Sequence, residues 1–134
     1  MRIQNAFNQV MNDFLNKAPD DDASKTIRRI ASFYPGTNSY YEVFNRFCNK
    51  LNISFFAAPY AIDNTETDAY IPCIKFDPGN LLNEEVRIVE YTNNPIDLIS
   101  AYRILAKELL YLLMKQTDLE SINNNIPKQV NTKS

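Results

Sequence analysis

One segment near the C-terminus of this chain is apolar around more than half of a helical circumference. Asn94-Pro95 is a typical helix start, with Asn as the N-cap and Pro at the first helical position. The pattern continues to Gln116, and its apolar members are Ile99, Tyr102, Leu105, Ala106, Leu109, Leu110, Leu112 and Leu113. Because a helix this apolar has little surface to leave in water, other elements must surround it. We therefore predict a long, buried C-terminal helix at the centre of the core.

Three earlier segments also carry apolar residues at helical spacing. The first covers residues 3–16, and the third covers residues 39–51 with Ser39 as its N-cap. The second, shorter helix lies between them and begins at Asp22 or Ser24, either of which is a suitable cap. The sequence thus predicts helices over most of its N-terminal part.

After the third helix the pattern changes to short segments rich in β-branched and aromatic residues, which favour strands. We predict strands over residues 53–58, 70–76 and 86–91. Pro72 has no N–H to donate, so the second strand should have a free edge or a bulge there. The predicted fold is α+β: N-terminal helices, a small sheet of about three strands and the long buried C-terminal helix.

The length of the chain fits one domain. Its 134 residues have a hydrophobic share of 45%, which is enough for a core. We predict a single α+β domain over residues 1–120 and a disordered polar tail over residues 121–134. Residues 1–16, which a polar link separates from the rest, are a candidate for a separate interaction helix.

The sequence contains no histidine, and this is the strongest constraint on its function. Histidine-based acid–base catalysis, Ser–His triads and His-ligated zinc are all excluded. The two cysteines, Cys48 and Cys73, are too few for a four-cysteine zinc site, and their spacing matches no redox motif. We interpret both as buried apolar residues in a reducing compartment. We therefore expect no catalytic residue, no metal and no cofactor.

The charge balance argues against nucleic acid as a ligand. The chain has 14 basic and 16 acidic residues and a net charge of -2, so it has no general attraction for a polyanion. It has no apolar stretch of about 18 residues that could span a membrane. Its N-terminus also lacks the apolar core of a signal peptide. We expect a cytoplasmic protein that binds neither nucleic acid nor membranes.

A polar arc on the predicted last helix contains Lys107, Glu108 and Tyr111. In the H-E-x-x-H motif of zincins, two histidines at this spacing bind zinc and the glutamate is the general base. Here Lys107 and Tyr111 stand at the histidine positions, and lysine presents a cation where a metal needs a lone pair. The same residues also fit an ordinary solvated helix face with neighbours at i, i+4, and both interpretations stay open.

Together with earlier segments, this helix resembles the ImmA/IrrE group of zincin-like metallopeptidases. Residues 41–51 with Asn52-Ile53 resemble the family's step from a helix into a strand, a step of the Leu-Gly-Ile type. Residues 81–85 resemble the polar approach after a strand, and residues 103–113 resemble the active-site helix. The resemblance covers residues 25–118 and implies a degenerate, metal-free member, since the metal ligands are absent. Of the family's functional residues only Glu108 corresponds in type, so the resemblance implies a pseudo-peptidase.

Two further clusters are candidate binding residues. Tyr40 and Tyr41 are adjacent, so they point to different sides of a helix and can form an exposed aromatic patch. The alternative is that both rings pack inside with their hydroxyls at the surface. Arg28 and Arg29 lie in a small basic cluster that could contact a phosphate or an acidic partner. A solvated face that pairs with the preceding aspartates explains the same cluster.

These observations favour a non-enzymatic protein-binding or regulatory module. Its partner is expected to be another protein, or a second copy of the chain in a homodimer. One alternative is a small acidic chaperone of the secretion type, which has a similar size, pI and α+β content. The other is an enzyme that uses Glu108, Glu90 and Tyr111 in place of histidine.

Overall fold

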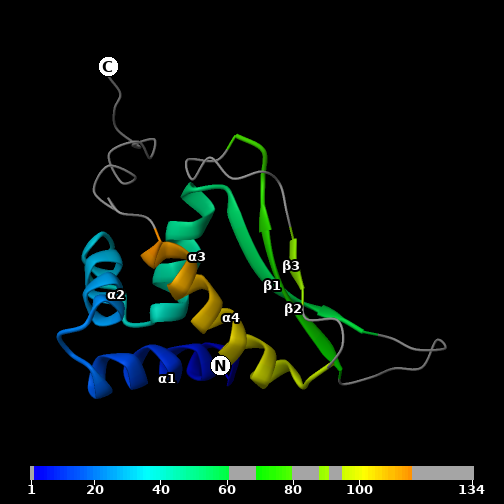
Figure 1. Cartoon of the computed structure of the whole chain (residues 1–134), viewed down its shortest axis with the longest axis horizontal. Coiled ribbons are helices and arrows are strands. Elements are labelled where there is room, and N and C mark those ends of the chain that lie inside the picture. The colour runs from blue at the N-terminus through cyan, green and yellow to red at the C-terminus, as the bar shows by residue number, and fades with distance from the viewer. Residues whose placement is uncertain (1, 61–68, 80–87, 91–94, 116–134) are drawn as a thin grey trace.

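The described residues form four helices and an antiparallel sheet, and the helices lie on one side of the sheet (Figure 1). The computed structural model describes residues 2–60, 69–79, 88–90 and 95–115. The elements are, in order, α1 (Arg2–Lys17), α2 (Asp22–Ser32), α3 (Tyr40–Lys50), β1 (Ile53–Pro59), β2 (Tyr70–Phe76), β3 (Ile88–Glu90) and α4 (Leu98–Met114). This confirms the predicted α+β class with N-terminal helices and a C-terminal helix.

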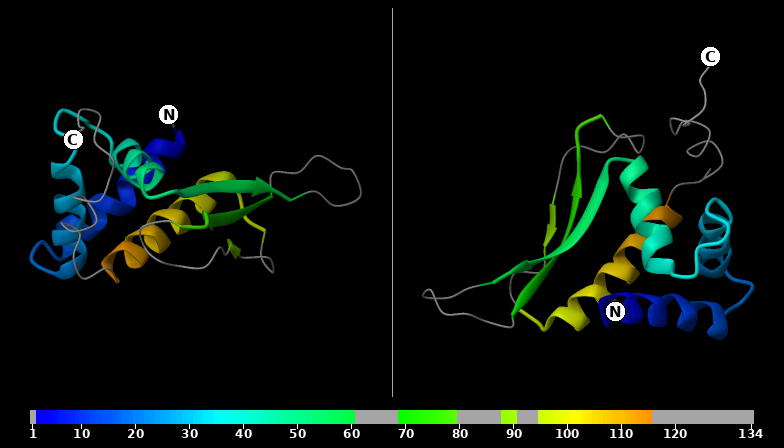
Figure 2. Two further views of the ribbon diagram at one scale, coloured as in Figure 1. Left: turned by 90° about the horizontal axis from the view of Figure 1, so that it is seen from above. Right: turned by 180° about the vertical axis from the view of Figure 1, so that it is seen from behind.

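Helix α4 lies in the middle of the fold. It packs against β1 and β2 on one side and against α1 and α2 on the other, as Figures 1 and 2 show. Its buried residues are Ala101, Leu105, Ala106, Leu109, Leu110, Leu112 and Leu113. The prediction that an apolar helix forms the centre of the core is therefore confirmed.

The start of α4 differs from the prediction, which placed it at Asn94-Pro95. The N-cap is Asp97, whose carboxylate accepts a hydrogen bond from the backbone N–H of Ser100 at 2.7 Å. Ile96 cannot join the helix because it forms an antiparallel bridge with Tyr70, with N···O distances of 2.7 and 3.1 Å. A tertiary contact therefore shortens the helix, which ends at Met114. Asn94 and Gln116 lie outside the described residues.

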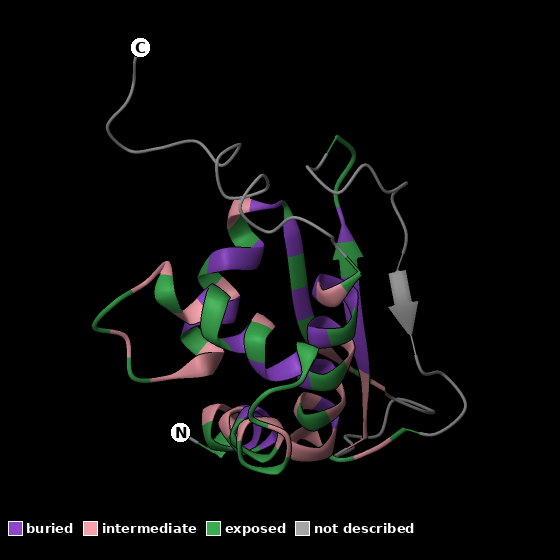
Figure 3. Cartoon of the chain, turned by 60° about the vertical axis from the view of Figure 1, so that its left-hand side comes forward, coloured by how far each residue is buried: buried purple, intermediate pink, exposed green. Residues whose placement is uncertain are grey.

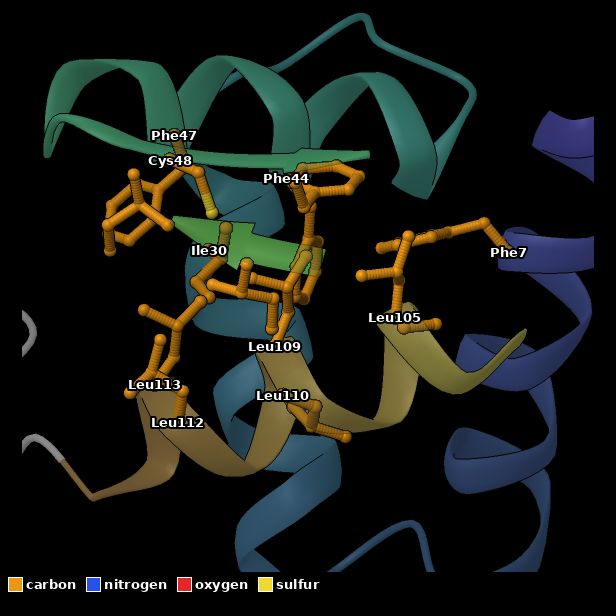
Figure 4. Packing of buried hydrophobic residues seen from close by; sticks show 14 of the residues in the cluster. Phe7, Ile30, Phe44, Phe47, Cys48, Leu105, Leu109, Leu110, Leu112 and Leu113 are labelled. Atoms are coloured by element: carbon orange, nitrogen blue, oxygen red, sulfur yellow. The ribbon is translucent and has the colours of Figure 1, made fainter. Parts of the chain in front are cut away.

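The core joins all four helices to the sheet. Figure 4 shows side chains from α1, α2, α3 and α4 that converge, and Figure 3 shows that the buried residues lie on the inward faces of the helices. The largest side chains with less than 2% of their surface exposed are Phe7, Phe44, Phe47, Phe76, Met11, Ile27, Ile30, Leu51, Ile53, Ile74, Leu105 and Leu109. Helix α1 contributes Phe7 and Met11, so the apolar face of the predicted interaction helix packs within the domain.

The N-cap of α3 agrees with the prediction, and the N-cap of α2 differs from it. Helix α3 has Ser39 as its N-cap, as predicted. Helix α2 is capped by Asp21, and not by Asp22 or Ser24 as predicted. Ser24 is fully buried, and its hydroxyl lies within hydrogen-bond distance of the carbonyls of Phe14 and Ala18 at the end of α1. The Ser24 hydroxyl therefore serves backbone carbonyl groups at the end of α1 and does not cap α2.

The described sheet consists mainly of β1 and β2. Strands β1 and β2 pair along their whole length, from Ile53 opposite Phe76 to Pro59 opposite Tyr70. Strand β3 is described over Ile88–Glu90, which pair with the residues from Cys73 to Lys75, and the remaining residues of the predicted strand over 86–91 lie outside the described residues. The described sheet is thus chiefly a hairpin of two strands with a short third strand, in the order β1-β2-β3. The predicted tail over residues 121–134 lies outside the described residues.

Pro72 interrupts the β2 ladder on one side only, without a bulge in the described β1–β2 pairing. The Tyr70 N–H donates to Ile96, away from β1, and the alternation of a strand turns the nitrogen of Pro72 to the same side. The pairing of β2 with β1 continues unbroken through Ala57 opposite Pro72. The described pairing therefore has no bulge at Pro72, and the position that would face Pro72 on the β3 side lies outside the described residues.

Candidate binding groove between helices α1 and α4

Helices α1 and α4 lie side by side and leave a groove between them. The groove encloses a hollow of about 320 Å³. Its lining residues are Gln9, Val10, Asp13, Phe14 and Lys17 from α1, and Arg103, Lys107 and Tyr111 from α4. Those from α4 are spaced at i, i+4 and i+8, so they form one stripe along the helix. Spacings of three and four residues on α1 place its lining side chains on one face.

The most exposed large apolar side chain in the described part of the chain belongs to this groove. Tyr111 keeps 48% of its surface exposed, and its ring packs edge-on against Phe14 with a centroid distance of 6.0 Å. An aromatic ring that is held by a neighbour and still faces water is a typical anchor for a protein partner.

Three cations line the same groove as the aromatic pair. Lys17, Arg103 and Lys107 are all exposed, and the charge of Arg103 also acts on the Asp97 carboxylate, whose pKa it helps to lower. The one carboxylate among the lining residues is that of Asp13, which is also exposed. The lining of the groove therefore has more positive than negative charge, with three cations and one carboxylate.

A second hollow lies next to the groove, toward the start of α4. It has a volume of about 910 Å³, and its lining residues are Arg2, Ile3, Tyr70, Asp97, Leu98, Ile99 and Arg103. Arg103 lines both hollows, so the two meet at its side chain. The pKa of the Asp97 carboxyl lies below its ordinary value, chiefly because the Ser100 N–H donates a hydrogen bond to it. That carboxylate is therefore already engaged in capping α4.

The structure brings together two of the three residues predicted on the last helix. Lys107 and Tyr111 line the groove, whereas Glu108 is half-buried and lines neither hollow. The groove opens between α4 and α1, and not between α4 and the sheet. The side chain of Glu90, a candidate of the alternative enzyme, lies outside the described residues.

Tyr40 and Tyr41 are both half-buried and pack against the core. The ring of Tyr41 has centroid distances of 5.5 Å to Phe7, 5.8 Å to Phe55 and 6.1 Å to Tyr102. Burial raises the pKa of the Tyr41 hydroxyl above its ordinary value. Of the two alternatives, internal packing describes Tyr41 better than an exposed aromatic patch.

Arg28 and Arg29 are exposed on α2, away from the groove. The guanidinium of Arg28 donates a hydrogen bond to the carbonyl of Pro19 at 2.7 Å. Arg28 therefore stabilises the backbone of the link between α1 and α2, where the prediction paired it with aspartate side chains.

The two cysteines are buried free thiols. Cys48 and Cys73 are both buried and no disulfide joins them, as predicted. Burial raises the pKa of the Cys48 thiol to about 12, so this thiol is protonated at neutral pH. The Cys73 thiol donates to the carbonyl of Ile71 at 3.4 Å.

Sequence reasoning missed Arg103, Lys17, Asp13 and Phe14 as members of a site. Each lies on an amphipathic helix, and only the pairing of α1 with α4 makes them neighbours. The available signal was the polar stripe at i, i+4 on each helix, which also describes an ordinary solvated face.

The described residues contain no group of three or more His, Cys, Asp or Glu side chains that could hold a metal ion. Among the helices of the described ranges, none combines the length and the apolar character needed to cross a membrane. Comparison of the chain with family models, with curated proteins and with solved structures gave no match.

Proposed function

We propose that this protein is a non-enzymatic binding module that acts through contact with another protein. The observation that carries the proposal is the half-exposed Tyr111, held against Phe14 in a groove with three exposed cations. Tyrosine and arginine are the residue types most enriched among the energetic centres of protein interfaces. The groove is open and its charged groups are solvated, which suits recognition better than water-excluded catalysis.

The resemblance to zincin-like peptidases supports the same proposal. Lys107 and Tyr111 stand where that family has its metal-binding histidines, and both side chains line the groove. Asn52 stands at the family's glycine in the step into the strand, and its φ of 61° is in the left-handed region that glycine favours. In this view the protein is a pseudo-peptidase whose former catalytic helix now contributes to a binding surface.

The proposal includes a cytoplasmic location and a protein partner, which is either a different protein or a second copy of the chain. Two buried cysteines without a disulfide between them support a reducing compartment.

A site-specific crosslink tests the binding function. The photoreactive amino acid benzoylphenylalanine replaces Tyr111 in the full chain, which is then irradiated in an extract of the native host. We expect a discrete covalent adduct, because the aromatic probe occupies the place of the proposed anchor. The matched control carries the probe at Asn49, an exposed residue of α3 that lines neither hollow. No adduct at position 111, or equal adducts at both positions, would contradict the proposal.

A further inference from the structure

We infer that the groove binds an acidic, extended peptide segment of the partner protein, along a trough that runs from the start of α4 to Tyr111. This inference rests on the proposed binding function and adds the chemistry of the occupant.

The two hollows are neighbours along α4 and adjoin at the side chain of Arg103, which lines both of them. Together they follow α4 from Asp97 to Tyr111, which is roughly 21 Å at about 1.5 Å per helical residue. An extended chain advances about 3.3 Å per residue, so a segment of about six residues spans this length. The trough therefore has the dimensions of a short linear peptide.

Charge complementarity identifies the occupant as acidic. The trough has four cations, those of Arg2, Lys17, Arg103 and Lys107, and two carboxylates. Its net charge of +2 contrasts with -2 for the entire chain. Both carboxylates compete with an acidic occupant, that of Asp13 in the groove and that of Asp97, which caps α4 and interacts with the charge of Arg103, in the second hollow.

The spacing of the cations on α4 also favours an anionic occupant. Arg103 and Lys107 lie one helical turn apart, a distance at which like charges repel. Carboxylates from a ligand would relieve this repulsion, and the guanidinium of Arg103 can bind one of them through two hydrogen bonds.

The lining fits a peptide better than a nucleic acid. Val10 is buried at the groove, and Ile3, Leu98 and Ile99 are half-buried in the second hollow, so apolar side chains have a surface to pack on. Asp13 presents a carboxylate, which can accept hydrogen bonds from peptide N–H groups, whereas a phosphate backbone has no donor to offer it. A peptide supplies carboxylates, N–H donors and apolar side chains together.

The crosslink at position 111 tests this inference when it is combined with charge reversal. The groove variant adds Arg103→Glu and Lys107→Glu to the probe protein. The control adds Lys25→Glu and Lys75→Glu, two exposed residues of α2 and β2 that line neither hollow. Both variants change the net charge equally, and circular dichroism verifies that both are folded. We expect the groove variant to lose about tenfold or more of the adduct while the control keeps it.

Two further readouts identify the chemistry of the occupant. Excess of a short glutamate peptide should suppress the adduct, whereas a glutamine peptide of equal length should not. Mass spectrometry should map the crosslink to a partner segment rich in Asp and Glu.

The outcomes separate the two proposals. An adduct that survives charge reversal in the groove, or that maps to a segment without acidic residues, overturns the acidic occupant and leaves the binding function standing. A nuclease-sensitive adduct, or one with the mass of two copies of this chain, overturns it in favour of nucleic acid or self-association. No adduct in any background overturns both proposals.

Discussion

Asn8 illustrates how one polar side chain connects two helices. Its Oδ1 accepts a hydrogen bond from the backbone N–H of Tyr41 at 2.9 Å, and its Nδ2 donates to the hydroxyl of Ser39 at 3.2 Å. Ser39 in turn accepts from the N–H of Glu42 at 3.5 Å. A residue of α1 therefore completes the N-terminal capping of α3. No local pattern in the sequence predicts this, because Asn8 and Ser39 are far apart along the chain.

Replacement of this asparagine should measurably destabilise the fold. We expect Asn8→Ala to lower the free energy of unfolding by about 1–2 kcal/mol, because it leaves a helix N–H without its partner. The control Asn5→Ala changes an exposed residue of the same helix and should cost less than about 0.5 kcal/mol. Urea denaturation of both variants provides the comparison. Equal losses of stability in the two variants would show that the hydrogen bonds of Asn8 to α3 and its cap add no stability.

The capping carboxylate of Asp97 predicts a dependence of stability on pH. Its pKa is lower in the folded state than the ordinary value of 3.8, chiefly because of the hydrogen bond from Ser100. The ionised carboxylate therefore stabilises the fold above pH 3.8, and this contribution is lost as the pH falls through the lowered pKa. Asp97→Asn keeps a capping oxygen without the charge.

We expect the free energy of unfolding of the wild type to exceed that of Asp97→Asn by more at pH 6 than at about pH 3. Urea denaturation of both proteins at the two pH values measures the difference. A stability difference that does not change between them would rule out the charge of Asp97 as the cause.

At the scale of elements, helix α1 belongs to the core although a polar link follows it. Phe7 is fully buried and lies against Tyr41, Phe44 and Phe55, with ring centroids 5.5–5.7 Å apart. Its outward residues, among them Asp13 and Lys17, contribute half of the groove. The helix thus has a structural face and a candidate binding face.

Truncation of the ring should therefore destabilise the entire domain. We expect Phe7→Ala to cost about 3–5 kcal/mol, since it removes a buried aromatic side chain and leaves a cavity. Asn12→Ala, an exposed change on the same helix, is the control. Urea denaturation followed by circular dichroism measures both. A cost below about 1 kcal/mol for Phe7→Ala would mean that α1 docks only loosely.

The elements themselves were largely predictable, because their apolar periodicity is strong. The first helix was predicted over residues 3–16 and is observed over Arg2–Lys17, and Ser39 was correctly identified as a cap. The errors fall where a distant residue decides. Ile96 is held by Tyr70, which delays the start of α4, and Ser24 bonds to the end of α1.

At the scale of the whole molecule, the candidate site could be predicted only in part. Lys107 and Tyr111 were visible as a motif on one helix. Their neighbours Lys17 and Phe14 come from the opposite end of the chain, and only the packing of α1 on α4 brings them together. Spacing within a helix identifies a face, but it does not say which other helix that face meets.

The central place of α4 has a consequence for synthesis on the ribosome. Both the hairpin of β1 and β2 and the pair α1 and α2 pack on α4, which is the last element of the described fold to emerge from the exit tunnel. Until α4 emerges, the core residues Phe7, Ile30 and Phe44 of the nascent chain cannot be fully buried. Vectorial folding of this domain must therefore wait for its final helix, and a stalled translation product would be a client for chaperones.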